Sequence, residues 1–148
     1  MATETIQVRS ATPADADAIW HLARDLATSA VLDRAAFDRT HAQLVTDPDG
    51  VVLVAEFPTR GVVGYLTARC WPTYRANGPV AWVDELMVAE TVRRSGASRA
   101  LMRHAEEWAR GIGAPQVALG TRRAGPFYRA LGYDASAEYF KKYLTSDA

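Results

Sequence analysis

The sequence contains a single cysteine, three scattered histidines and no long hydrophobic run. Cys70 has no second cysteine to pair with, so an intramolecular disulfide is excluded. His21, His41 and His104 show no metal-ligand spacing with a cysteine or carboxylate cluster, which predicts no metal site. No stretch approaches the roughly 18 to 20 apolar residues of a membrane span, and the N-terminal residues lack the regions of a signal peptide. We therefore expect a soluble, cytoplasmic protein that has no membrane partner.

The sequence also lacks an excess of charge of either sign. Its 17 Lys and Arg residues balance its 17 Asp and Glu residues, so the formal net charge is zero. Without a basic field, nucleic acid and anionic lipid are not expected as partners, and any polyanion must be held by a local group of residues. The 148 residues, of which 49% are hydrophobic, suit a single domain over 1–148 with its own core.

Hydrophobic periodicity switches between strand and helix patterns along the chain. It predicts, in order, a strand at Ile6 and Val8, a helix capped by Thr12 and Pro13 that runs to Leu26, a helix from about Arg34 to Val45, strands over Val51–Phe57, Val62–Cys70 and Val80–Val88, a helix from Leu101 to Ala109, a strand over Gln116–Leu119, a short helix near Phe127–Leu131 and a last strand around Glu138–Leu144. The order β-α-α-β-β-β-α-β-α-β, with short links between the three central strands, indicates an antiparallel meander in a mixed α/β fold.

An apolar strand runs through an arginine-rich turn into a helix over residues 82–102. The first amides of a helix lack internal partners and carry partial positive charge, so this end favours an anion. Arg93 and Arg94 add fixed charge that pairs well with phosphate. Three small residues allow a ligand to approach the backbone of the turn closely: Gly96, Ala97 and Ser98. The pattern predicts a pyrophosphate site, and solvated surface arginines beside a turn glycine are the alternative reading.

Two adjacent carboxylates, Asp84 and Glu85, interrupt the otherwise apolar strand before this turn. Strand alternation predicts that they point to opposite faces of the sheet. One of them is then expected to face a polar cleft, where it can orient an amine or take its proton, while the other pairs with an arginine or faces solvent. The alternative is two edge-exposed carboxylates without a chemical role.

Two motifs resemble those of the GNAT superfamily of N-acetyltransferases. Arg93, Gly96 and Ser98 follow the spacing Gln/Arg-x-x-Gly-x-Gly/Ala, with serine in the last place. Residues 121–133, TRRAGPFYRALGY, are similar to the family's Asn-x-x-Ala-x-x-Phe-Tyr run that leads to Leu-Gly-Phe/Tyr, with Thr121 in place of asparagine. The opening IQVRSATPADADAIWHL also resembles the family's first strand and helix, so the likeness spans nearly the whole chain.

The resemblance implies a central, mostly antiparallel mixed sheet of six to seven strands with about four helices. It implies an acetyl-CoA-dependent N-acetyltransferase that transfers an acetyl group to a primary amine of a small molecule or a protein. The transfer is direct, in a ternary complex, without a metal. Dimers are common in the family, so a homodimer is one open oligomeric state.

Carried over by position, Tyr128 is the general acid and Asp84 or Glu85 is the general base. Asp84 ranks slightly higher because some relatives place an acidic residue there. The acetyl-CoA-binding residues implied by the resemblance are Leu86, Met87, Val88, Arg93, Arg94, Ser95, Gly96, Ala97, Ser98, Thr121, Phe127 and Tyr128. Acceptor specificity is expected in the loops Ala27–Ala36 and Trp71–Gly78. Four aromatic residues are candidates for either the acceptor cleft or the core: Trp20, Trp71, Tyr74 and Trp82.

The main alternative function is a non-catalytic acyl-CoA-binding or regulatory module, in which the pyrophosphate site works but the acceptor site does not. The substitutions at Ser98 and Thr121 favour it, whereas Tyr128 and the acidic pair speak against it. A dinucleotide-binding fold fits poorly, because the turn lacks GxGxxG and three adjacent strands precede it. The identity of the amine acceptor stays open at this point.

Overall fold

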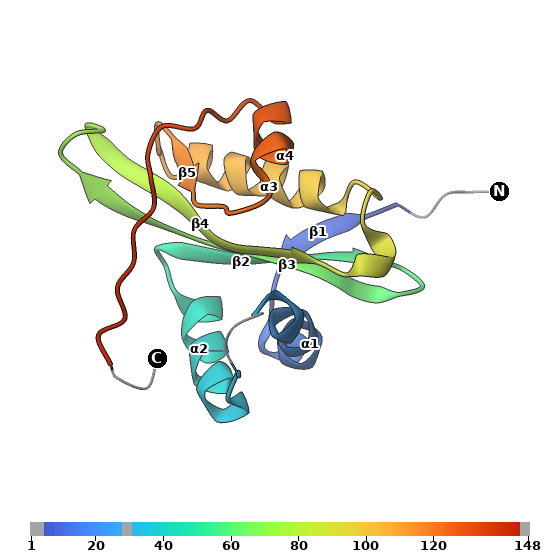
Figure 1. The fold of residues 1–148 in the computed structure, drawn as a ribbon. Coiled ribbons are helices and arrows are strands. Elements are labelled where there is room, and N and C mark those ends of the chain that lie inside the picture. The colour runs from blue at the N-terminus through green and yellow to red at the C-terminus, as the bar shows by residue number, and fades with distance from the viewer. Residues whose placement is uncertain (1–4, 28–30, 146–148) are drawn as a thin grey trace.

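The computed structural model describes residues 5–27 and 31–145, which form a twisted sheet with helices on both faces (Figure 1). In chain order the elements are β1 (Gln7–Ser10), a 3-10 turn (Pro13–Asp15), α1 (Ala16–Leu26), α2 (Arg34–Thr46), β2 (Gly50–Phe57), β3 (Gly61–Thr73), β4 (Gly78–Val88), a second 3-10 turn (Glu90–Val92), α3 (Ala97–Gly111), β5 (Val117–Leu119) and α4 (Gly125–Ala130). The predicted order of elements is confirmed from β1 to α4.

The strands lie in the sheet in their chain order, β1-β2-β3-β4-β5. The first four strands pair antiparallel, and β5 pairs parallel with β4. Short turns at 58–60 and 74–77 join the three long central strands. The predicted meander and the mostly antiparallel, mixed character of the sheet are therefore confirmed, as are the four helices.

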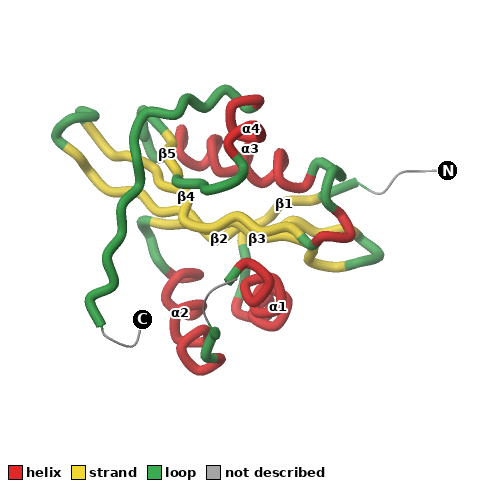
Figure 2. Tube along the Cα trace, in the orientation of Figure 1, coloured by secondary structure: helices red, strands yellow, loops and turns green. Residues whose placement is uncertain are grey.

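Helices cover both faces of the sheet, with α3 and α4 on one side and α1 and α2 on the other (Figures 1 and 2). Each face has its own hydrophobic cluster. Leu66 and Leu101 are buried on the α3 side, whereas Val54 and Tyr65 are buried on the α1 side. Because both faces are covered, β2 and β3 read as nearly continuous apolar runs. No helix in the described ranges is long and apolar enough to cross a membrane.

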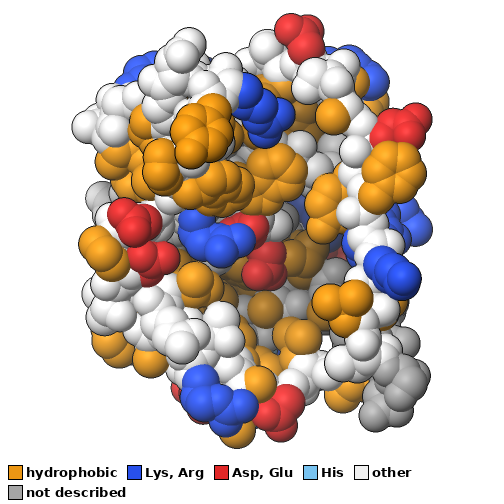
Figure 3. All heavy atoms as spheres, turned by 90° about the vertical axis from the view of Figure 1, so that its left-hand side faces the viewer, with side chains coloured by type: hydrophobic (Ala, Val, Ile, Leu, Met, Phe, Trp, Pro, Cys, Tyr) orange, Lys and Arg blue, Asp and Glu red, His pale blue; other side chains and the backbone are white. Residues whose placement is uncertain are grey.

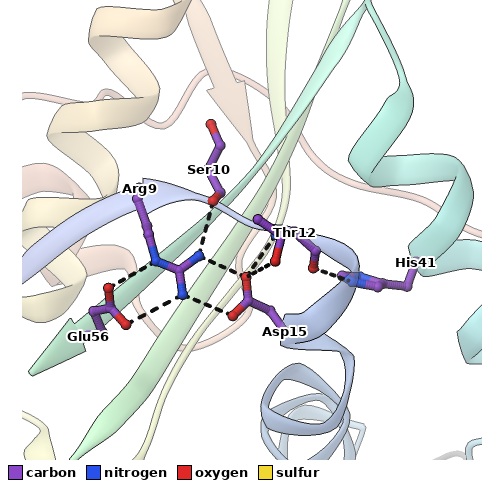
Figure 4. A network of polar contacts seen from close by, with 6 residues as sticks. All are labelled: Arg9, Ser10, Thr12, Asp15, His41 and Glu56. Carbon is purple, nitrogen blue, oxygen red and sulfur yellow. Dashed lines mark hydrogen bonds and ion pairs between the residues drawn. The ribbon is translucent and has the colours of Figure 1, made fainter.

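Arg9 in β1 ties the sheet to the helices of the α1 side (Figure 4). Its guanidinium donates to both carboxylate oxygens of Asp15 at 2.8 and 3.0 Å, and to Glu56 in β2 at 2.9 Å. Asp15 is only 8% exposed and also accepts the backbone amide of Thr12 at 2.8 Å. These bonds, chiefly that from Arg9, hold the pKa of Asp15 below its usual value. The ring of the buried His41 in α2 lies 3.0 Å from the Thr12 carbonyl, so the network links both helices to the sheet.

The C-terminal segment differs from the prediction. The strand expected around Glu138–Leu144 is not formed, and the sheet has five strands over the described residues instead of six to seven. The segment runs along the outside of the molecule without pairing (Figure 2). Its apolar residues come as two adjacent pairs around two lysines, so they do not alternate as a half-buried strand requires. Four of these side chains are exposed: Tyr139, Phe140, Tyr143 and Leu144.

Asp15→Asn tests the anchoring network. Removing the charge leaves Arg9 without its buried partner, so we expect the free energy of unfolding at neutral pH to fall by about 1–3 kcal/mol. The lowered pKa of Asp15 means that its stabilisation is present above the unfolded-state pKa of 3.8 and is lost as the pH falls through the folded-state value. The difference between wild type and variant should therefore shrink in acid, as measured by denaturant unfolding from pH 7 downward.

The matched control for that experiment is Asp17→Asn. Asp17 also bonds an arginine, Arg34 at 2.6 Å, but its side chain is 82% exposed, so this variant should unfold like the wild type. Equal stability of Asp15→Asn and Asp17→Asn at neutral pH would contradict the anchoring role of Asp15.

Candidate active site

Strand β4 contains one extra residue relative to β3 at the position of Asp84. Thr67 pairs with Glu85 and the next β3 residue, Ala68, pairs with Val83, so Asp84 has no partner in the register. The insertion of one residue is a β-bulge, which bends the strand and breaks the strict alternation of side chains. The two carboxylates therefore do not follow the simple strand pattern.

Both carboxylates bond side chains on the same face of β3. The hydroxyl of Tyr65 donates to Glu85 at 2.8 Å, and the guanidinium of Arg69 donates to Asp84 at 2.8 and 3.3 Å. Tyr65 and Arg69 are four positions apart in β3, so they share a face. The predicted opposite orientation of the carboxylates is wrong because the bulge turns Asp84 to the same side as Glu85. The expected pairing of one carboxylate with an arginine is confirmed for Asp84.

The two carboxylates have different surroundings. Burial and the negative charge of Glu85 raise the pKa of Tyr65, so its hydroxyl stays protonated and keeps donating to Glu85. Asp84 instead lies in an ion pair with Arg69, whose side chain is half exposed. Among the described residues Glu85 thus has a neutral partner and no cation in an ion pair with it, whereas Asp84 is paired with an arginine.

Glu85 lines a cavity of about 420 Å³ between α1, α2 and the sheet. The face of the molecule shown in Figure 3 has acidic and basic side chains gathered near its middle, among many hydrophobic ones. Asp84 and Arg69 do not line the cavity, at least as far as the described residues show. The specificity loop expected at 27–36 contributes through Val31, Leu32, Asp33 and Ala36, and residues 28–30 lie outside the described ranges. The loop expected at 71–78 contributes no described lining residue.

The cavity also contains Thr67, which sequence reasoning missed. Thr67 is 6% exposed, and its hydroxyl is buried without any hydrogen-bond partner in the described structure. A signal was present in the sequence: Tyr65, Thr67 and Arg69 recur at every second position of an otherwise apolar predicted strand. Such a row places three polar groups on one face of the sheet. Buried polar groups are normally paired, so the Thr67 hydroxyl beside a carboxylate is a candidate acceptor for a ligand's hydrogen bond.

Strand β4 continues past the end of its pairing with β5. The last parallel pair joins Val83 to Leu119, whereas β4 runs on to Val88. From Asp84 to Val88 the outer edge of β4 therefore has no neighbouring strand in the part of the chain that the structure describes. Free backbone groups at such an edge can pair with an extended ligand as a strand would. Leu86, Met87 and Val88, which the family resemblance assigns to acetyl-CoA binding, lie on this stretch.

The arginine-rich turn lies at the start of α3. Gly96 has a φ of 92°, and Arg94 also has a positive φ of 70°, which is uncommon for a residue other than glycine. Arg93, Arg94 and Ser95 line a depression of about 340 Å³ together with Arg60 from the β2–β3 turn. No described carboxylate forms an ion pair with these three arginines. The depression therefore suits an anion such as a pyrophosphate.

Two details of this turn differ from the sequence analysis. Ala97 and Ser98, expected in the turn, are the first residues of α3, which begins four residues before Leu101. The helix extends because Ala97 is buried against the sheet with Leu101. Arg60 was missed, since only the folding of the β2–β3 turn brings it close to Arg93 and no sequence spacing encodes that.

Tyr128 in α4 packs on the α3 side of the sheet. Phe127 contacts it edge-on with ring centroids 5.0 Å apart, and Tyr133 does so at 5.9 Å. Thr121 precedes the helix, and its hydroxyl accepts the amide of Ala124 at 3.1 Å. Burial raises the pKa of Tyr128 above its usual value, which favours the protonated phenol at neutral pH.

The three tyrosines near the site differ in how their hydroxyls are used. The hydroxyl of Tyr65 bonds Glu85 and that of Tyr133 bonds Glu106 at 2.6 Å. The hydroxyl of Tyr128 makes no such bond within the described residues, so its proton is available to a ligand.

None of the four aromatic residues proposed for an acceptor cleft lines the cavity in the described structure; Trp20 instead packs edge-on against Phe37 at 5.3 Å.

The predicted site residues therefore lie in four places. Glu85 faces a cavity on the α1 side, whereas Tyr128 lies on the α3 side of the same sheet. The unpaired edge of β4 and, after it, the arginine-rich turn lie between Glu85 and Tyr128 in the sequence. Asp84 stands apart because it is bound to Arg69.

Known proteins resemble this chain in sequence and in fold. The profile of the Acetyltransferase (GNAT) family matches residues 16–133. Aminoglycoside N(6')-acetyltransferase type 1 from Acinetobacter genomosp. 13 is 30% identical over 121 residues, which cover 72% of this chain and 82% of that protein.

Solved structures show the same fold at lower identity. Aminoglycoside N-acetyltransferase AAC(6')-Iy in complex with CoA superposes with a TM-score of 0.85 at 14% identity, over 97% of this chain and 98% of that one. Glucosamine-6-phosphate N-acetyltransferase from Arabidopsis thaliana gives a TM-score of 0.84 at 18% identity, over 96% and 100% of the two chains.

Tyr128→Phe tests the environment of the phenol. Because burial raises the pKa of Tyr128, the difference in phenolate absorbance between wild type and variant should develop above pH 10. Spectrophotometric titration measures it, and Tyr74→Phe, which removes a fully exposed phenol, provides the reference curve. A Tyr128 difference that develops at or below pH 10 would show that the ring is not in the environment described.

Proposed function

We propose that this chain, which belongs to the acetyltransferase (GNAT) family, transfers an acetyl group from acetyl-CoA directly to a primary amine. The chain is an acetyltransferase by its family and by its relative. One arrangement supports the finer proposal. Glu85 lines a cavity on one face of the sheet, and Tyr128 lies on the other face. The edge of β4 beyond Val83, which has no neighbouring described strand, follows Glu85 along the chain.

The described residues fit acetyl-CoA in two places. Arg60, Arg93 and Arg94, with the first amides of α3, would hold the pyrophosphate. The edge of β4 from Leu86 to Val88 would pair with the extended pantetheine arm, as an added strand does. A backbone amide on this edge would also stabilise the negative charge that develops on the acyl oxygen.

Ser98 and Thr121 are the positions that depart from the family pattern. Ser98 lies in the first turn of α3, where its side chain is small enough to leave the helix start open to phosphate. Thr121 bonds the start of α4 at Ala124 and so positions the helix that carries Tyr128. Neither departure removes a group that the proposed reaction needs.

Glu85 is the better general base of the two carboxylates. An amine arrives protonated and must lose a proton before its nitrogen can attack. Glu85 lines the cavity and carries a charge that no cation balances, whereas Asp84 is held by Arg69 outside the cavity. Glu85 would therefore accept the proton, and Asp84 would fix the bulge that places Glu85 at the cavity.

Tyr128 would act as the general acid. The thioester supplies an activated acetyl carbon, and its C–S bond breaks as the amine nitrogen bonds to that carbon. The leaving thiolate takes up a proton, and the raised pKa of Tyr128 keeps a proton on its hydroxyl until then. The hydroxyl has no competing partner in the described structure, so it can turn toward the sulfur.

Gly96→Glu tests the acetyl-CoA site. The new side chain places a carboxylate beside the arginines, so acetyl-CoA should bind about tenfold more weakly or worse in titration calorimetry. Gly113→Glu is the matched control, since Gly113 lies just beyond the other end of α3, also has a positive φ of 81° and also has open space around it. Equal affinity of the two variants would place the phosphate site elsewhere.

Glu85→Gln tests the base. With saturating acetyl-CoA and a primary amine, kcat should fall by about 100-fold or more, because glutamine cannot accept the proton. Asp84→Asn should stay within a few-fold of wild type. Thiol release measures both, and circular dichroism checks the fold. A larger loss in Asp84→Asn than in Glu85→Gln would assign the base to Asp84 instead.

A further inference from the structure

The walls of the cavity that Glu85 lines are mainly hydrophobic. Its volume of about 420 Å³ is near the lower end of the range for ligand pockets. The principal apolar side chains around it are Ile19, Ala23, Leu32, Phe37, Leu44 and Val52. A ligand inside therefore contacts mainly groups that offer it no hydrogen bonds.

Three polar side chains on the cavity wall already bond other groups of the protein. Asp33 caps α2 by accepting the amide of Ala36 at 2.8 Å, and it is exposed. The His41 ring bonds a backbone carbonyl at 3.0 Å. Tyr65 donates its hydroxyl to Glu85. On the α2 side this leaves the second oxygen of Asp33 and the side chain of Thr40, both of which are exposed.

Two groups on the sheet remain available to a ligand. Glu85 uses one carboxylate oxygen for Tyr65, which leaves the second oxygen. Thr67 has a buried hydroxyl without a partner in the described structure. The two residues pair directly across β3 and β4, so their side chains are neighbours on one face. Together they offer two hydrogen-bond acceptors to one nitrogen.

We propose that the acceptor is a small primary amine with a hydrophobic body, whose nitrogen is held by Glu85 and Thr67. This inference rests on the proposed function. The ammonium donates one N–H to each of the two side chains, and the apolar walls bury its body. A polycation rich in hydroxyls fits poorly, since its many hydroxyls would lose water and find few partners on these walls.

This assignment differs from what the names of the relatives describe. The curated relative is named for aminoglycosides, which carry several amines and many hydroxyls. At 30% identity the reaction class is shared, but the acceptor is set by the residues of the pocket. In this chain those residues provide Glu85 on the sheet, Asp33 at the start of α2 and walls that are mainly hydrophobic.

A series of straight-chain amines from propylamine to hexylamine tests the proposal, with sisomicin as the polycationic competitor. Each buried methylene should raise kcat/KM by about fourfold, and sisomicin should react more slowly than hexylamine. Thiol release with saturating acetyl-CoA measures the rates. A flat series, or faster reaction with sisomicin, overturns the inference and leaves the proposed function standing.

Val52→Thr tests the cavity wall directly. This substitution keeps the shape and places a hydroxyl in the cavity, so kcat/KM for hexylamine should fall about fivefold or more. Val51→Thr is the matched control, because Val51 packs on the opposite face of the same strand against the α3 side. Equal effects of the two variants would show that the amine does not lie against Val52.

Thr67→Val separates a ligand-binding role from a structural one. The hydroxyl has no protein partner among the described residues, so its removal should raise the Tm. The same change should raise KM for hexylamine about tenfold, because one partner of the nitrogen is lost. A lowered Tm with an unchanged KM overturns the role of Thr67.

If acetyl-CoA binds but no amine releases thiol, the proposed function fails and the inference fails with it.

Discussion

The structure depends above all on where β4 stops pairing with β5. The last pair is Val83 with Leu119, and the bulge at Asp84 follows immediately. A bulge increases the local twist and bends its strand, so it gives a physical reason for the two strands to part at this residue. The same bulge turns Glu85 toward the α1-side cavity. One inserted residue thus frees a strand edge and orients the carboxylate that we propose as the base.

Much of the fold could be predicted from the sequence because its elements carry strong periodic patterns. The buried face of α3, with Leu101, Met102 and Ala105, follows helical spacing, and the turn residues between β2, β3 and β4 mark the meander. The C-terminal strand could not be predicted correctly, because a high content of apolar and aromatic residues resembles a strand even where the alternation fails. In this segment the residue composition favoured a strand, whereas the lack of strict apolar–polar alternation did not, and the structure agrees with the lack of alternation.

The site was harder to predict than the fold because its geometry depends on register. The acidic pair and Tyr128 stand out in the sequence, but the bulge that puts Asp84 and Glu85 on one face is set by the pairing of β3 with β4. Arg60 reaches the phosphate depression only through the folded β2–β3 turn. The unpaired hydroxyl of Thr67 has meaning only when the cavity around it is known. Local sequence encodes the residue types, and tertiary pairing decides which of them meet.

A crystal structure of the protein with CoA would test the account most directly. We predict that the pyrophosphate lies against Arg93 and the start of α3, that the pantetheine arm pairs with β4 between Leu86 and Val88, and that the thiol ends between Glu85 and the hydroxyl of Tyr128. A thiol far from both side chains, or CoA bound away from the gap between β4 and β5, would contradict the account.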